Sequence, residues 1–135
     1  MTVSFMVLIG LVGWTLALLI LMEAMRGMLV MNKTVPSNTF RPDNSNLSPF
    51  MQRLARAHAN CVESLPVFGI LLLAALVTGR SGITDPLAPW LLVARVVQSC
   101  IHVASLSVAA VNARFAAFVV QIAIASWWTV ALLRA

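Results

Sequence analysis

The chain has 135 residues, of which 61% are hydrophobic and only 10% are charged, and its mean hydropathy is +0.95. A water-soluble domain needs more polar residues to cover its surface, so this composition excludes that class and indicates a chain covered by lipid. The net charge of +5 comes from basic residues near the ends of apolar segments. Membrane topology and anionic headgroups explain such a pattern, and we therefore expect no nucleic-acid partner.

The first apolar segment covers residues 3–25 and is followed by a polar connection over residues 32–47. About 20 apolar residues in a helix cross a bilayer, and the first segment meets that length with one charge, Glu23, near its end. The connection is rich in Asn, Ser, Pro and Thr, which predicts a loop. Glu23 and the nearby Arg26 are spaced to pair at the membrane interface.

The second segment covers residues 49–78. Ser48 is its predicted N-cap, and Pro49 fits the first helical position, where a backbone N–H is not needed. Gly79 follows the last residue and ends the helix. Pro66 lies inside the segment and removes one backbone donor, so we expect a kink there.

The third and fourth segments cover residues 86–110 and 114–133, joined by a tight connection over residues 111–113. Asp85 is the predicted N-cap of the third helix, with Pro86 directly after it. Taken together, the four segments predict an all-α integral membrane protein built as a bundle of four transmembrane helices.

The cysteines and tryptophans in these segments have simple interpretations. Cys61 and Cys100 lie in apolar runs without metal-ligand spacing, so we predict free buried thiols and no metal site. We interpret the tryptophans as lipid-facing or interfacial anchors. They are Trp14, Trp90, Trp127 and Trp128.

Basic residues are concentrated at one end of the predicted bundle. Only two basic residues, Arg80 and Arg134, lie at the opposite end. Because cytoplasmic loops carry the excess of Lys and Arg, we expect the first and third loops to be cytoplasmic. A bacterial inner membrane and an endoplasmic reticulum membrane both fit this multi-pass protein. The residues that flank the first and third loops are Arg26, Lys33, Arg41, Arg53, Arg56 and Arg114.

Polar side chains form a stripe on each of two predicted helices. Residues three or four positions apart share one face of a helix. The second helix has Arg53, Arg56, Asn60 and Glu63 at this spacing, and the third has Arg95, Gln98 and His102. Because the second helix enters the membrane where the third helix leaves it, we expect the two stripes to meet.

Two interpretations of these stripes remain open. The side chains could form a pocket for a small anionic or zwitterionic molecule, since arginine forks bind carboxylates and Glu63 can hold an ammonium group. They could equally form ion pairs and interhelical hydrogen bonds that join helices or subunits. Spacing alone does not decide between a ligand site and structural contacts.

One stretch of the second helix matches a family pattern. It reads Arg56-Ala-His-Ala-Asn60-Cys-Val-Glu63-Ser-Leu-Pro66. It resembles the second helix of the MAPEG family, the membrane-associated proteins in eicosanoid and glutathione metabolism, at every fixed position of Arg-Ala-x-x-Asn-x-x-Glu-x-x-Pro. The family includes microsomal glutathione transferases, leukotriene C synthase and microsomal prostaglandin E synthase. The resemblance covers nearly the whole chain, with four spans, a long first loop and an arginine in the third helix.

The resemblance implies a homotrimer that binds glutathione as co-substrate between neighbouring subunits on the cytoplasmic side. Arg114 corresponds to the arginine that stabilises the glutathione thiolate, because a cation beside a thiol lowers its pKa. The chain has no tyrosine, whereas the eicosanoid synthases of the family have tyrosines in this site. That difference argues against a specialised eicosanoid synthase. The residues that match the glutathione site are Arg26, Arg56, Asn60, Glu63, Arg95, Gln98 and His102.

The resemblance favours an enzyme over a structural protein. We expect a glutathione-dependent transferase or peroxidase that acts on lipophilic electrophiles or hydroperoxides, with the lipophilic molecule supplied from the membrane lipid. The alternative is a non-enzymatic MAPEG-like membrane protein. In that case the polar residues would join subunits or line a lipid-binding crevice.

Overall fold

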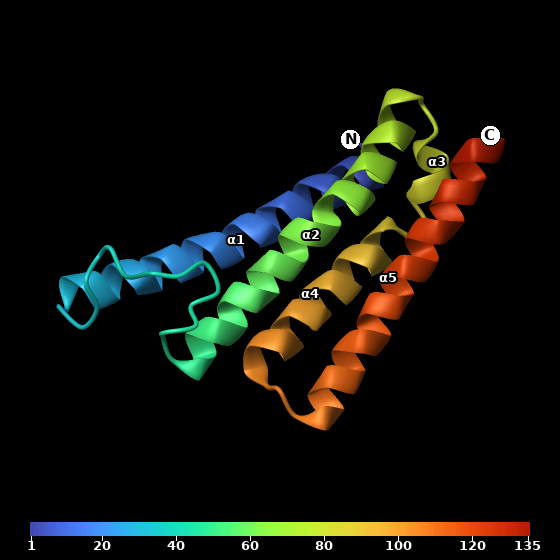
Figure 1. Cartoon of the computed structure of the whole chain (residues 1–135). Helices are drawn as coiled ribbons and strands as arrows, with labels where there is room; N and C mark the ends of the chain where they lie inside the picture. The colour runs from blue at the N-terminus through green and yellow to red at the C-terminus, as the bar shows by residue number, and fades with distance from the viewer.

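The computed structural model describes residues 1–135, and all of its regular structure is helical (Figure 1). The helices α1, α2 and α5 are long and apolar enough to cross a membrane, and α4 is a shorter apolar helix of 17 residues. This agrees with the predicted helical membrane bundle. The five helices are α1 (Val3–Met31), α2 (Pro49–Val77), α3 (Ser81–Thr84), α4 (Ala88–Ala104) and α5 (Val108–Arg134).

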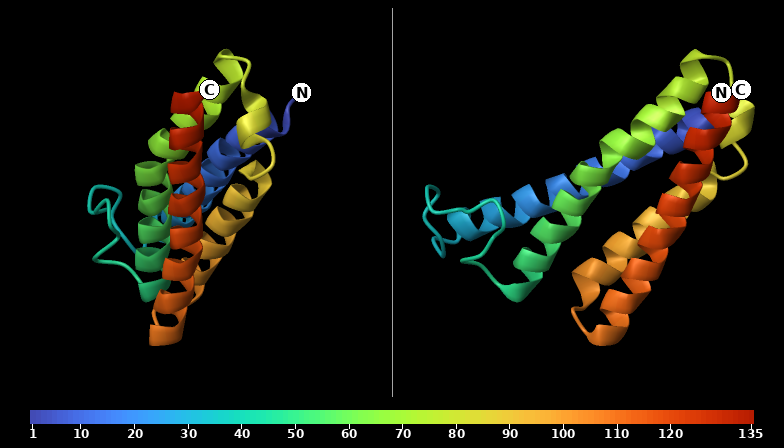
Figure 2. Two further views of the ribbon diagram at one scale, coloured as in Figure 1. Left: turned by 90° about the vertical axis from the view of Figure 1, so that its right-hand side faces the viewer. Right: turned by 45° about the vertical axis from the view of Figure 1, so that its right-hand side comes forward.

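The four long helices run alternately up and down, and α4 packs against α1, α2 and α5. Both chain termini lie at the same end as α3, whereas the long loop lies at the opposite end (Figures 1 and 2). The helices converge at the α3 end, and α1 diverges from α5 toward the loop end (Figure 1). α5 packs mainly on α4 and has a smaller contact with α2.

The apolar core lies at the α3 end of the bundle, where α1, α2, α4 and α5 all contribute side chains. Leu72 and Leu91 are fully buried there, and so is Trp128 of α5. The prediction that Trp128 faces lipid is therefore wrong, although Trp90 and Trp127 are exposed. A large aromatic side chain gains more free energy from burial in the core than a smaller one does. Trp128 is buried because it lies on the face of α5 that packs against the other helices.

The first helix ends at Met31 and not near residue 25 as predicted. The segment after Met25 contains strong helix formers, and Arg26 pairs with Glu23, so neither charge interrupts the helix. The chain turns only after Asn32, where Lys33 adopts a positive φ of 56°. The second helix has its predicted start at Pro49, with the Ser48 side chain accepting from the backbone N–H of Met51.

The connection between the third and fourth spans lies at residues 105–107 and not at the predicted 111–113. The Ser107 hydroxyl accepts a hydrogen bond from the backbone N–H of Ala110 (3.2 Å) and so caps α5. The Ser105 hydroxyl accepts from the backbone N–H of Ser107 (3.0 Å), which closes the turn. Arg114 consequently lies inside α5 and not at its start.

Asp85 does not cap the third span as predicted. Its Oδ1 atom instead accepts hydrogen bonds from the backbone N–H (2.8 Å) and the hydroxyl of Ser4, in the first turn of α1. The Ser4 and Thr84 hydroxyls are 2.6 Å apart and buried. Leu87 precedes α4 without a side-chain cap. The carboxylate thus satisfies a free N–H group of another helix, which fastens α1 to α3.

Candidate functional site

The polar stripes of α2 and α4 meet, as the spacing predicted, at Asn60. The Asn60 Oδ1 atom accepts a hydrogen bond from Arg95 Nη1 (2.6 Å) and a second from Gln98 Nε2 (3.2 Å). Arg95 and Gln98 are buried. A buried polar group requires a partner, and here the partner comes from the neighbouring helix.

Gln121 of α5, which was not predicted as a site residue, extends this polar cluster. Its Nε2 atom donates to Gln98 Oε1 (2.9 Å) and to the backbone carbonyl of Ala117 (3.0 Å), and the side chain is fully buried. Gln121 is an isolated amide in an apolar span and follows Arg114 by seven residues, which is two helical turns. That spacing was the available signal for a polar face on α5.

Arg95 is only 2% exposed, yet most of its guanidinium group has no polar partner. Its Nη1 atom binds Asn60, but neither Nε nor Nη2 makes a hydrogen bond. The guanidinium carbon lies 5.7 Å from the ring centre of Phe68 and 6.0 Å from that of Phe118. Cation–π contacts with two rings stabilise the charge, while Nε and Nη2 stay buried without a polar partner.

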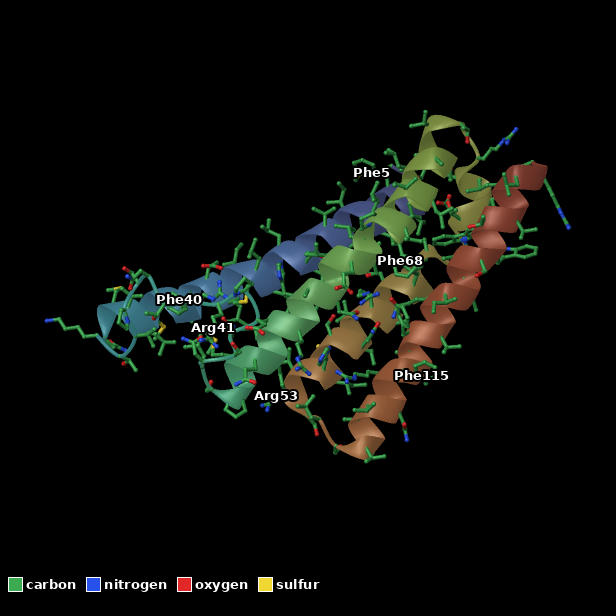
Figure 3. All side chains as sticks on the ribbon, in the orientation of Figure 1. Phe5, Phe40, Arg41, Arg53, Phe68 and Phe115 are labelled. Atoms are coloured by element: carbon green, nitrogen blue, oxygen red, sulfur yellow. The ribbon has the colours of Figure 1, made fainter.

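Two cavities adjoin the cluster and share Asn60 and Phe118 in their linings, and we call the pair the α2–α5 crevice. Phe68 and Phe115 lie on its α2 and α5 sides (Figure 3). The polar cavity, of about 270 Å³, is lined by Asn60, Gln98, His102, Val111, Arg114, Phe115 and Phe118. The apolar cavity, of about 260 Å³, is lined by Asn60, Glu63, Ser64, Val67, Phe68, Phe118 and Ile122.

Arg26 lies away from the crevice and holds the long loop against α1. It forms the only ion pair of the chain, with Glu23 (3.0 Å), as predicted. It also donates to Asn44 Oδ1 (3.0 Å from Nε), and its guanidinium carbon lies 5.5 Å from the Phe40 ring. Figure 3 shows Phe40 on the loop beside α1. Within one subunit, Arg26 therefore has a structural role and does not reach the polar cluster.

The loop has its own internal order. Asn44 is fully buried at a positive φ of 54°, and its Nδ2 atom donates to the Met51 carbonyl (2.8 Å). The backbone N–H of Ser45 donates to Asp43 Oδ1 (3.0 Å), and this hydrogen bond lowers the pKa of the Asp43 carboxyl. A cavity of about 590 Å³ lies between the loop and α1, lined mainly by apolar side chains and remote from the polar cluster.

Comparison with protein-family models adds the decisive observation, because the model described as the MAPEG family matches residues 4–134. The chain belongs to the MAPEG family. This confirms the resemblance predicted from the second helix, and it identifies the chain as an integral membrane protein with a glutathione-related function in the general sense of that family. Searches of curated proteins and of solved structures found no match.

The residues of the MAPEG motif occupy different positions in the structure. Asn60 lies at the junction of both cavities, and Glu63 lines the apolar cavity, where it is exposed and makes no ion pair. Arg56 is also exposed and lines small hollows beside Pro42 and Pro49, outside the crevice.

Two residues from outside the motif line the polar cavity. His102 and Arg114 line the polar cavity together, and Arg114 Nη1 is buried without a hydrogen-bond partner. Arg53, the remaining arginine of the predicted stripe, donates from Nε to the Val103 carbonyl (2.8 Å) and ties α2 to the end of α4. Arg53 therefore holds two helices together and does not line the crevice.

Proposed function

We propose that this MAPEG protein is a glutathione-dependent transferase or peroxidase that acts on lipophilic electrophiles or hydroperoxides at the membrane. One observation carries the proposal: the polar and the apolar cavity share Asn60 and Phe118. A water-soluble thiol peptide in the first cavity would therefore lie beside a lipophilic molecule in the second. Holding two reactants together at the correct distance removes much of the entropic barrier to their reaction.

Arg114 is the proposed catalytic residue. Arg114 lines the polar cavity and has no carboxylate partner, so its guanidinium group would donate to the glutathione sulfur, which favours the thiolate over the thiol. In conjugation the thiolate forms a carbon–sulfur bond, and either the leaving group departs with the electron pair or the opened epoxide oxygen takes the pair and a proton from water. In peroxide reduction the thiolate attacks the outer oxygen, the O–O bond breaks to give a sulfenic acid, and the departing alkoxide takes a proton from water to become the alcohol. A second glutathione thiol then attacks the sulfenic acid and yields the disulfide and water.

The remaining polar groups suit the charges of the peptide. Glu63 is unpaired and would hold the ammonium group, whereas the buried Arg95, which lines neither cavity, would act on the ligand through Asn60. Gln98 and His102 line the polar cavity, where the peptide would bind. In the proposed homotrimer, Arg26 and Arg56 of a neighbouring subunit would close the site, with the first and third loops on the cytoplasmic side.

The experiment is calorimetric titration of the detergent-solubilised protein with glutathione, followed by conjugation and peroxidase assays. We expect Glu63→Gln to weaken glutathione binding by about 10-fold or more, since a hydrogen bond to a charged group contributes about 1.5–3 kcal/mol. Arg114→Ala should lower kcat more than it lowers glutathione affinity. It should also shift the pH dependence of kcat to higher pH, because the bound thiol loses the cation that lowers its pKa. Arg80→Ala, at the α3 end, is the control. No binding at millimolar glutathione would contradict the proposal.

A second candidate, a non-enzymatic membrane protein, is favoured by the exposure of Arg56 and Glu63. Both charges lie on the surface of α2 without an ion partner, so a neighbouring subunit could neutralise them. This candidate predicts that Glu63→Gln dissociates the oligomer in size-exclusion chromatography with light scattering, and that glutathione changes nothing. The proposed enzyme predicts an intact oligomer with weaker glutathione binding.

A further inference from the structure

The side-chain amides between α5 and α2 form a chain of hydrogen bonds in which each amide donates to the next, from α5 toward α2. It starts at the Ala117 carbonyl, which can only accept, and receives a hydrogen from Gln121 Nε2. Gln121 Nε2 also donates to Gln98 Oε1, and Gln98 Nε2 donates to Asn60 Oδ1. The chain ends at Arg95, which can only donate and which also binds Asn60 Oδ1.

These two ends fix the orientation of every amide between them. An amide can be turned over with little change of shape, because its oxygen and its nitrogen are almost the same size. Arg95 requires the oxygen of Asn60 to face it, and the Ala117 carbonyl requires the nitrogen of Gln121. With both ends determined, Gln98 has only one orientation that makes both of its hydrogen bonds.

The consequence falls on Asn60. Its oxygen has two donors, whereas its Nδ2 atom makes no hydrogen bond inside the protein and is not among the buried, unpartnered atoms. Since Asn60 lines both cavities of the α2–α5 crevice, the Nδ2 hydrogens are the polar atoms that it presents to a ligand.

We propose that Gln121 is a positioning residue: it holds Gln98 and, through Gln98, holds Asn60 as a donor at the junction of the two cavities. The crevice then accepts a ligand oxygen that is a hydrogen-bond acceptor at this point, such as a carboxylate or a peptide carbonyl, and disfavours a donor. The proposal rests on the proposed function only in its use of glutathione as the probe.

Removal of the Gln121 donor leaves the Gln98 oxygen without its partner, so Gln98 no longer has a fixed position beside Asn60. Asn60 then keeps only the hydrogen bond from Arg95. A single hydrogen bond lets the amide plane rotate, so the Nδ2 hydrogens no longer have one defined direction in the crevice. Gln121 touches no ligand in this scheme, because it is fully buried and lines neither cavity.

The first test is Gln121→Met, which keeps the side-chain length and removes the amide. We expect glutathione binding to weaken about 10-fold, the value of roughly one hydrogen bond, with KM raised and kcat at saturating glutathione unchanged. Thr129→Val is the matched control, because Thr129 donates to the Ala125 carbonyl four residues earlier on the same helix, as Gln121 does to Ala117. Equal effects of the two variants would overturn the proposal.

A double-mutant cycle with Asn60→Asp tests whether Gln121 acts through Asn60. An aspartate at this position has no amide hydrogens to present, so Gln121→Met should cause no further loss of affinity in that background. A 10-fold loss in both backgrounds would show that Gln121 acts on stability or packing and not on Asn60.

A measurement on the wild-type protein needs neither a ligand nor a substitution at Gln121. Side-chain amide signals in ¹⁵N NMR, assigned with Asn60→Asp, should show fast hydrogen exchange for Asn60 and protection for Gln98 and Gln121. Protected Asn60 hydrogens would refute the proposal even if glutathione binds. If glutathione does not bind at all, the proposed function fails, and this measurement alone decides the role of Gln121.

Discussion

Replacement of Arg95 by methionine separates a role in positioning Asn60 for a ligand from a purely structural role. The substitution removes one charge-assisted hydrogen bond, to Asn60, worth about 1.5–3 kcal/mol, and ring contacts worth about 0.5–2 kcal/mol. It also removes two buried N–H groups without partners, each of which costs about 1–3 kcal/mol in the native state. These terms nearly cancel, so we expect the free energy of unfolding to change by less than about 2 kcal/mol.

The two readouts for Arg95→Met should then diverge. Chemical denaturation in detergent should give almost the wild-type stability. Calorimetry should show glutathione affinity at least 10-fold lower, because Asn60 loses the charged donor that fixes its orientation toward the crevice. Loss of more than about 3 kcal/mol of stability would refute this reasoning. It would mean that the free donors of Arg95 neutralise a protein anion in the assembled state.

Two further predictions concern the fastenings at opposite ends of the bundle. Asp85→Ala should lower the free energy of unfolding by about 2–4 kcal/mol, since Ser4 loses a charged acceptor for both its N–H and its hydroxyl. Asp43→Ala, which removes an exposed carboxylate in the loop, is the control. A loss below about 0.5 kcal/mol would show that water replaces the carboxylate. Asn44→Ala should release the loop and speed its cleavage in limited proteolysis at least several-fold, because a residue at positive φ loses both the Arg26 and the Met51 hydrogen bonds. Unchanged cleavage would show that the remaining contacts of Arg26 hold the loop alone.

The bundle could be predicted from the sequence because lipid imposes simple rules. Apolar length located the spans, and Ser48 with Pro49 located the start of α2. The turn before α5 was misplaced because hydropathy dominated the prediction, although Ser107 supplied a good cap. Trp128 could not be placed from composition, since an interfacial and a buried tryptophan differ only in the helix face they occupy.

The site was predictable in part. Period-three and period-four spacing predicted that the stripes of α2 and α4 would meet, and the hydrogen bonds from Arg95 and Gln98 to Asn60 confirm that meeting. The ligand that these residues hold stays a prediction. Gln121 was missed because a single amide makes no stripe, and its importance comes from the partner that tertiary packing gives it.

Glu63 is the middle residue of α2, which runs from Pro49 to Val77, and its carboxylate is exposed. In a lone subunit surrounded by lipid, this charge would lie near the middle of the bilayer at a cost of about 2.5–3.5 kcal/mol. For the proposed homotrimer we therefore expect insertion to be coupled to assembly, because a neighbouring subunit or water would have to cover Glu63. In that case the abundance of the protein in a cell should depend on how completely the chains assemble and not only on the rate of synthesis.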